Sequence, residues 1–146
     1  MSTTTEPLPT KSTALTINRI KSLVHHWMSI WDMNTGDATP LIEVLSPEGF
    51  QINASTVPEP ITTVAGVRAW FAEFPKHVKI DNHNVESIDI EELPNGRYRV
   101  LTKITCPGVT IDDKPFLVTS EHDWEVADYG GLFPRICTFT VHLTRH

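Results

Sequence analysis

The sequence predicts an α+β fold in which a long, bent antiparallel sheet wraps a long N-terminal helix and encloses a cone. Two observations lead to this fold class. Apolar residues follow a helical period through most of the first 74 residues, and they alternate with period two from about residue 77 onward. A length of 146 residues suits one domain with its own core. We expect a tail at residues 1–12 and a single domain at residues 13–146.

Three helices and one short strand are expected in the first half of the chain. Apolar positions spaced by three and four define the first helix, and Gly36 is a plausible stop after it. Thr39 is the expected N-cap of the second helix, and Pro75 is expected to end the third. The helices are expected at residues 13–35, 40–45 and 63–74, and the strand at residues 50–54.

The second half of the chain predicts four consecutive strands. Asn95-Gly96 is a strong signal for a tight hairpin between the first two, and Pro107-Gly108 is expected to break the second. In the first strand the apolar positions change parity between Asn82 and Ser87, which predicts a bulge that bends the sheet. The strands are expected at residues 77–92, 97–106, 116–126 and 135–143.

The composition narrows the possible functions. The chain has 12 basic and 18 acidic residues, a formal charge of -6, which argues against nucleic-acid binding. It has no apolar run long enough for a membrane span and no secretion signal, so a cytoplasmic protein is expected. Cys106 and Cys137 are expected to be buried reduced thiols. Motifs for metal, nucleotide or dinucleotide binding are missing, so we expect neither a metal nor a cofactor.

The stretch from Phe116 to Val126 alternates cleanly, and one face carries His122 among apolar neighbours. Successive side chains of a strand point to opposite sides of the sheet, so His122 is expected at the level of the core. A polar group there needs a partner or a cavity. The pattern therefore favours a lined pocket inside the cone. For the last strand, sequence leaves open which parity faces the cone, because one bulge reverses it.

Five short motifs occur in order between Ile17 and Leu143. They are Trp31-Asp32 followed by Gly36-Asp37, Gly66 ahead of Trp70-Phe71, His83-x-Val85-x-Ser87-Ile88-x-Ile90, Asp123-Trp124-Glu125-Val126, and Arg135-Ile136. This order resembles the nuclear transport factor 2-like superfamily, especially its SnoaL-like and ketosteroid-isomerase-like branch. The resemblance implies a conical, cystatin-like α+β barrel, a homodimer through the outer face of the sheet, and usually no cofactor.

The resemblance also implies a range of activities. Enzymes of this superfamily include isomerases, dehydratases, cyclases and epoxide hydrolases that work by acid-base chemistry, and other members only bind or transport. Asp32 resembles the acidic residue at the helix end that lines the cone, and His83 resembles the histidine on the bent strand. The spacing leaves open whether Asp32, Asn34 or Asp37 points inward. The carboxylate base of the ketosteroid isomerases has no clear match, so that activity is not favoured.

Asp32, His83 and His122 are the candidate catalytic residues. An imidazole has a pKa of about 6.5 in model peptides, so it can give or take protons near neutrality. A carboxylate beside it can fix the tautomer and stabilise the imidazolium. Such a set suits proton abstraction next to a carbonyl, dehydration or addition of water. The alternative is that both histidines are satisfied core residues and that Asp32 is exposed.

Aromatic side chains with a few polar groups are the usual lining of a pocket for small molecules, although they are also normal core residues. We expect a small, mostly apolar, oxygen-bearing ligand. The candidate ligand-binding residues are Trp31, Phe50, Trp70, Phe74, Tyr98, Ser120 and Trp124. The leading hypothesis is a cofactor-free isomerase, dehydratase or cyclase. The alternatives are a non-catalytic binding module and a protein-interaction adaptor that uses the outer face of the sheet.

Overall fold

The structure is a computed structural model and describes residues 11–146. Residues 1–10 of the expected tail lie outside the described residues, and the first helix begins at Lys11. The helices are α1 (Lys11–Met33), α2 (Thr39–Ile42) and α3 (Val64–His77), with a 3-10 turn at Pro94–Gly96. The strands are β1 (Gln51–Ala54), β2 (Val78–Asp81), β3 (Asn84–Glu92), β4 (Arg97–Thr110), β5 (Pro115–Ala127) and β6 (Arg135–Arg145).

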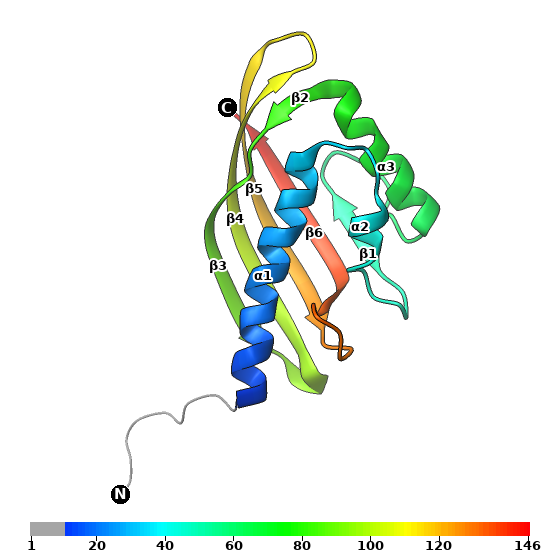
Figure 1. Cartoon of the computed structure of the whole chain (residues 1–146), viewed down its shortest axis with the longest axis vertical. Helices are drawn as coiled ribbons and strands as arrows, with labels where there is room; N and C mark the ends of the chain where they lie inside the picture. Colours follow the sequence, from blue (N-terminus) through cyan, green and yellow to red (C-terminus); the bar gives the residue numbers. More distant parts are fainter. Residues whose placement is uncertain (1–10) are drawn as a thin grey trace, which may run out of the picture.

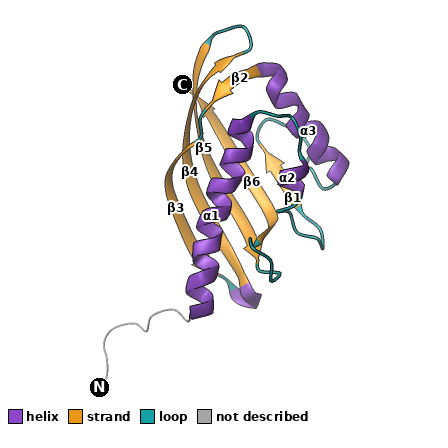
Figure 2. Ribbon diagram, in the orientation of Figure 1, coloured by secondary structure: helices purple, strands orange, loops and turns teal. Residues whose placement is uncertain are grey.

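The strands form one curved sheet, and α1 runs along its concave face (Figures 1 and 2). The order is β1-β6-β5-β4, and both β2 and β3 pair with β4. All neighbouring strands are antiparallel except β1 and β6, which are parallel. Helices α2 and α3 lie beside β1, at the opposite edge from β3 (Figure 2). The predicted α+β fold with a bent sheet around a long helix is confirmed.

The core lies between α1 and the inner face of β4, β5 and β6. Trp27 of α1 contacts two residues of this face: its ring lies 5.7 Å from Trp124 and 4.9 Å from Phe139. We call these three residues the inner aromatic cluster; each is at most 1% exposed. Burial of such large rings is a main source of stability in a domain of this size. Bulky side chains therefore fill the middle of the cone.

The bend predicted between Asn82 and Ser87 is present and divides one expected strand into two. β2 ends at Asp81, β3 starts at Asn84, and the pairing of β3 with β4 shifts register between Val85 and Ser87. His83 therefore lies at the junction between the two strands. Asn95, with φ 67°, and Gly96, with φ 70°, make the predicted tight turn. Because both strands pair with β4, the junction is held against the sheet.

Three residues do not take the positions expected for them at helix boundaries. Thr39 is the first residue of α2 rather than its N-cap, because Asp37 Oδ1 accepts the Thr39 N–H at 3.0 Å. Asn34, with φ 53°, takes the left-handed position after α1, ahead of Gly36. Pro75 does not end α3, which continues to His77. A proline in the last turn removes only one helical hydrogen bond, so the helix can continue past it.

The expected end of the second long strand at Pro107-Gly108 is also wrong, since β4 continues to Thr110. Pro107 contributes its carbonyl, which accepts the Asn82 N–H at 3.1 Å. Gly108 pairs with Asp81, and a Cβ at Gly108 would lie 2.6 Å from the Ile80 carbonyl oxygen. β2 can therefore approach β4 only because residue 108 has no side chain.

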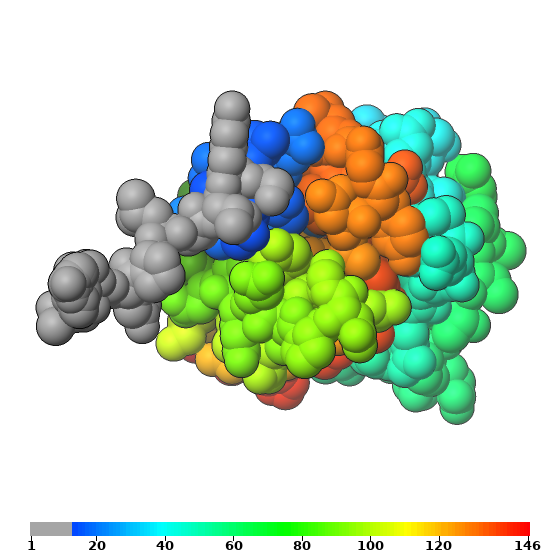
Figure 3. Space-filling view, turned by 90° about the horizontal axis from the view of Figure 1, so that it is seen from below, coloured from blue at the N-terminus to red at the C-terminus, as the bar shows by residue number. Residues whose placement is uncertain are grey.

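The structure decides the parity of the last strand. Phe139 and Val141 belong to the buried core, and the residues that follow each of them are exposed. Ile136 also belongs to the core, because the pairing with β5 shifts register between Glu125 and Val126. Cys106 and Cys137 are both buried and free, as predicted. No helix within residues 11–146 is long and apolar enough to cross a membrane. At one end of the molecule the β5–β6 loop lies against the β3–β4 turn and the first part of α1 (Figure 3).

Candidate functional site

Asp32 and His83 meet where the C-terminal end of α1 reaches the β2–β3 junction. Asp32 Oδ1 lies 2.6 Å from His83 Nδ1. The backbone N–H of His83 also donates to both carboxylate oxygens of Asp32, at 3.1 and 3.0 Å. The side chains are 25% and 16% exposed, so solvent reaches the pair. Since one carboxylate holds both the backbone and the ring of His83, the imidazole is fixed relative to α1.

The structure also decides which polar residue near the end of α1 points inward. Asn34 Nδ2 donates to two backbone carbonyls of β2, those of Val78 at 2.9 Å and Lys79 at 3.2 Å. Asp37 is exposed, and its Oδ1 accepts the N–H of Thr39, the first residue of α2. Only Asp32, of the three candidates, contacts His83. Asn34 acts on the site indirectly, because it fastens the end of α1 to β2.

A second carboxylate, which the sequence analysis missed, contacts the same ring nitrogen. Asp81 Oδ2 lies 3.1 Å from His83 Nδ1, and the Asp81 side chain is completely buried. The thiol of Cys106 on β4 points to the same oxygen at 3.8 Å. Asp81 Oδ1 has no hydrogen-bond partner among the described residues. The signal in the sequence was the spacing, since residues two apart on an extended segment can share a side.

The two carboxylates determine the charge of His83. Burial alone lowers the pKa of an imidazole, but here the hydrogen bonds to Asp32 and Asp81, with a smaller effect of Cys106, outweigh it. Together they raise the pKa of His83 to about 11. His83 is therefore an imidazolium at neutral pH. Both carboxylates meet Nδ1, so Nε2 is the nitrogen that is not committed to a carboxylate.

His122 lies deeper, on the inner face of β5, and is neutral. Burial, together with the positive charge of His83, lowers its pKa to about 3. Its Nδ1 accepts the Trp124 indole N–H at 3.3 Å. An indole N–H can only donate, so the imidazole proton is on Nε2, which donates to Ser120 Oγ at 3.0 Å. Both nitrogens are thus engaged within β5.

The predicted catalytic set is therefore brought together in part. Asp32 and His83 form a direct pair, but within residues 11–146 no hydrogen bond joins His122 to either of them. His83 acts on His122 only electrostatically within the described residues, because its positive charge lowers the pKa of His122. Thr102 lies opposite His122 in the pairing of β4 with β5, and its buried hydroxyl has no hydrogen-bond partner within the described range.

The candidate ligand-binding residues fall into two groups. Trp31 lies next to Asp32 in sequence and packs edge-to-face on α3, at 4.9 Å from Trp70, 4.6 Å from Phe71 and 5.0 Å from Phe74. We call these four residues the Trp31 cluster. Phe71 is fully buried, whereas the other three are partly exposed. The remaining candidates are Tyr98, Ser120 and Trp124, which are buried, and Phe50, which is partly buried against the core.

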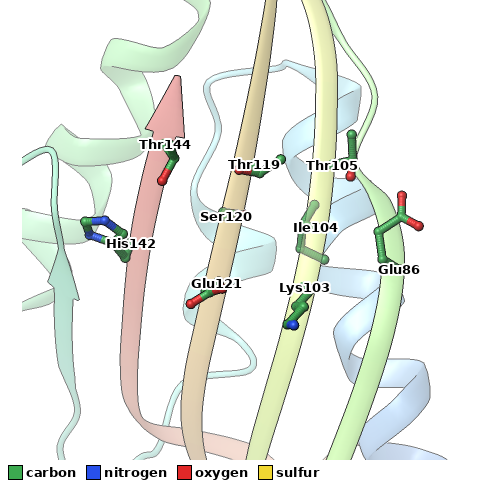
Figure 4. A pocket seen from close by; sticks show the side chains of 9 residues that line it. All are labelled: Glu86, Lys103, Ile104, Thr105, Thr119, Ser120, Glu121, His142 and Thr144. Carbon is green, nitrogen blue, oxygen red and sulfur yellow. The ribbon is translucent and has the colours of Figure 1, made fainter. Parts of the chain in front are cut away.

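Two surface depressions of the described chain are lined by residues other than Asp32 and His83. One is a groove of about 300 Å³ on the outer face of the sheet (Figure 4). It is lined by Glu86, Lys103, Ile104, Thr105, Thr119, Ser120, Glu121, His142 and Thr144. The other, of about 580 Å³, lies beside the β5–β6 loop and is lined by His26, Glu43, Val44, Leu132, Phe133 and Arg135.

Asp81, His83 and Cys106 are the residues that could offer ligands to a metal. Their ligand atoms lie within 4.8 Å of one another. A carboxylate, an imidazole and a thiolate suit zinc. Nδ1 of His83, however, is already held by Asp32 at 2.6 Å. Hydrogen bonds within the cluster account for this arrangement, so we assign no metal to it.

Neither a protein-family model nor a curated protein matches the sequence. Solved structures do match. A proposed aromatic ring hydroxylase from Novosphingobium aromaticivorans superposes with a TM-score of 0.79 at 15% identity over 96% of each chain. A proposed scytalone dehydratase from the same species gives 0.80 at 11% identity, over 93% of this chain and 89% of the other.

A third neighbour is the hexachlorocyclohexane dehydrochlorinase LinA-type3 from Novosphingobium barchaimii. It superposes with a TM-score of 0.71 at 10% identity, over 92% of this chain and 90% of the other. At these identities the likeness concerns the fold. A Caulobacter vibrioides protein with a cystatin-like fold and nuclear transport factor 2 from Cryptosporidium parvum also match, with TM-scores of 0.70 and 0.68. The chain therefore has the nuclear transport factor 2-like, cystatin-like α+β fold.

Proposed function

We propose that the chain is a cofactor-independent acid-base enzyme of the lyase or isomerase type, with Asp32 and His83 as its catalytic pair. The observation that carries this proposal is the 2.6 Å contact between Asp32 Oδ1 and His83 Nδ1 at a position that solvent reaches. A carboxylate that holds one imidazole nitrogen orients the ring and stabilises its charged form. The other nitrogen is then available for proton exchange with a substrate.

The charge of His83 suggests the order of proton transfers. In a dehydration, Nε2 gives its proton to the departing hydroxyl group, and the carbon–oxygen bond breaks to release water. The neutral imidazole then takes a proton from the neighbouring carbon as the double bond forms. The net reaction is loss of water, and His83 ends in its starting state. Because the carboxylates raise the pKa of His83, neutral His83 is a strong base in the second step.

The substrate we propose is small, mostly apolar and oxygen-bearing. The Trp31 cluster has three partly exposed rings, and Trp31 precedes Asp32 in sequence; such rings suit contact with an apolar ring or chain. The names of two fold neighbours, a proposed scytalone dehydratase and a dehydrochlorinase, fit loss of a small leaving group. His122 enters the proposal as a neutral polar group whose pKa is lowered by burial and by the charge of His83. It lies beside Ser120 and Trp124, with which its hydrogen bonds are made.

The test is turnover of a panel of cyclic β-hydroxy ketones, followed by the ultraviolet absorbance of the enone product. We expect wild-type protein to dehydrate at least one member, and H83Q to lose turnover about 100-fold or more, as for removal of a general acid-base group. H25Q is the matched control, because His25 is exposed on α1. Equal turnover by H83Q and H25Q would remove His83 from the mechanism.

The second candidate function is a binding module without chemistry. It is favoured by the inner aromatic cluster, which fills the middle of the cone, and by the two surface depressions, which are lined by residues other than Asp32 and His83. The two functions differ in one result. If the chain is a binding module, the H83Q variant still binds a compound of the panel, and the wild-type protein binds that compound without converting it.

We also propose that two copies associate through the outer face of the sheet. Lys103 and Glu121 face each other across β4 and β5 in the outer groove, and His142 follows on β6 (Figure 4). Side chains of both signs on one face can pair with the same face of a second copy, as a two-fold interface requires. Leu101, 39% exposed on the same face of β4 as Lys103, adds apolar area.

A further inference from the structure

We propose that Asp81 is a positioning residue of the site: together with Asp32 it holds the Nδ1 proton of His83, so that Nε2 is the atom that exchanges a proton with substrate. This inference rests on the proposed function, in which His83 is catalytic, and it assigns a role to a residue that does not itself contact the substrate. It rests on the buried contacts of Asp81, on its place in the fold, and on the charge of the cluster.

Asp81 is directed at the ring by the geometry of β2. The two residues before it, Lys79 and Ile80, are exposed, whereas the Asp81 side chain is fully buried. Asp81 pairs with Gly108, where the absence of a side chain lets the two backbones approach. In this buried position the carboxylate contacts the His83 ring and the Cys106 thiol.

The two carboxylates make different contacts with His83. Asp32 binds both the backbone N–H and Nδ1, and it is partly exposed. Asp81 meets only Nδ1, at 3.1 Å, and is shielded from water. One N–H directed between two acceptors has little freedom to leave Nδ1. When His83 gives up a proton, the one on Nε2 is therefore the one that leaves.

The charge of the cluster argues for a functional reason to keep Asp81. A single carboxylate already neutralises the imidazolium, so a second one leaves a net negative charge in a mostly buried place. Burial of an extra charge is costly, and one oxygen of Asp81 is also without a hydrogen-bond partner among residues 11–146. A group that costs stability in this way is expected where it serves a site.

The experiment compares D32N with the double variant D32N/D81N by ¹⁵N NMR of the histidine rings over a pH series. The other groups that face His83 are Cys106 from β4 and the neutral His122 from β5, and both variants keep them. In D32N, Asp81 is the remaining carboxylate. We expect neutral His83 to keep its proton on Nδ1 in D32N and to show mixed tautomers in the double variant.

We further expect the proton affinity of His83 to be at least tenfold lower in the double variant than in D32N. If the two variants share the same tautomer and the same proton affinity within twofold, Asp81 does not position the ring and the proposal is wrong. D89N on the D32N background is the matched control, since Asp89 is exposed on β3. If D32N/D81N does not fold, D32N/D81S replaces it, because the smaller serine leaves room for water where the carboxylate was. We expect the same mixed tautomers and the same lower proton affinity in that variant.

This measurement requires no substrate. It therefore tests the role of Asp81 even if no compound of the turnover panel is a substrate. The proposed function is tested separately, by the turnover of H83Q. A loss of stability alone does not satisfy the proposal. The single variant D81N loses a buried carboxylate but also a contact that stabilises the imidazolium, so its resistance to urea does not decide the proposal.

Discussion

His83 and His122 are both largely buried, yet their neighbours move the two pKa values in opposite directions. Two carboxylates raise the pKa of His83, whereas burial next to the charged His83 lowers that of His122. One ring is therefore charged and the other neutral at the same pH. Groups with separated pKa values are typical of functional sites, and a difference of this kind supplies a proton donor beside a neutral polar group.

These shifts predict how the stability changes with pH. The pKa of His83 is about 11 when folded and about 6.5 when unfolded, so its contribution is complete below pH 6.5 and is lost as the pH rises towards 11. The pKa of His122 is about 3 when folded, so between pH 6.5 and pH 3 only the unfolded state takes up its proton, and stability falls with falling pH.

Urea unfolding at several pH values tests both effects. We expect H122Q to flatten the acid side of the stability curve and H83Q to flatten the alkaline side, each relative to H25Q. The outcome is decided by the slope of the free energy of unfolding against pH. The absolute free energies are not compared, since each substitution also changes packing. Parallel curves for H122Q and the wild type between pH 4 and pH 6 would contradict the assignment of a buried, neutral His122.

At the scale of the elements, the site depends on the close approach of β2 to β4. The contact is possible because Gly108 has no side chain: a Cβ there would lie 2.2 Å from the Phe116 ring and 2.6 Å from the Ile80 carbonyl oxygen. The end of α1 is fastened to the same strand by Asn34. Asp32, Asp81 and His83 therefore meet where the end of α1, the end of β2 and the β2–β3 junction come together.

G108A is expected to destabilise the fold by about 1–3 kcal/mol, the usual cost of forcing extra atoms into a packed region. G131A is the control, because a Cβ at Gly131 meets only the Phe133 carbonyl oxygen, at 3.9 Å. The free energy of unfolding in urea measures both. Equal stability of the two variants would show that β2 can shift at little cost.

Particular elements show what the sequence could predict. The bend at Asn82 to Ser87 was visible as a change of parity. Asp32 and His83 were found because they resemble the acidic residue at the helix end and the histidine on the bent strand of the nuclear transport factor 2-like superfamily. Pro107-Gly108 was misleading, since the pair resembles a strand end but lies within β4. Asp81 was missed because its direction depends on the register shift in β2 and on its pairing with Gly108, which are long-range features.

At the scale of the whole molecule, the two faces of the sheet have different composition. The inner face is buried against α1 and carries Trp124 and Phe139 of the inner aromatic cluster. The outer face combines charged and threonine side chains with Leu101 and with Leu117, which is 40% exposed. An outer face of this kind fits the proposed contact between two copies, and it leaves Asp32 and His83 accessible from the opposite side.

We expect light scattering after gel filtration to give a mass of two 16.4 kDa chains at micromolar concentration. L101R is expected to give a monomer, because two added positive charges would face each other across the two-fold axis. L132R is the matched control, since Leu132 is 73% exposed in the β5–β6 loop. A monomeric wild-type protein, or a dimer with L101R, would contradict an interface on the outer face.

The most direct test of the central claim is the protonation state of His83 in the wild-type protein. We would follow the ring nitrogens by ¹⁵N NMR from pH 5 to pH 10, with H83Q to assign the signal. We expect both nitrogens to stay protonated through about pH 9, as a pKa near 11 requires. A ring that loses its proton near pH 6.5, or that is neutral at pH 7, would contradict a charged His83 held by carboxylates and would remove the proton donor from the proposed mechanism.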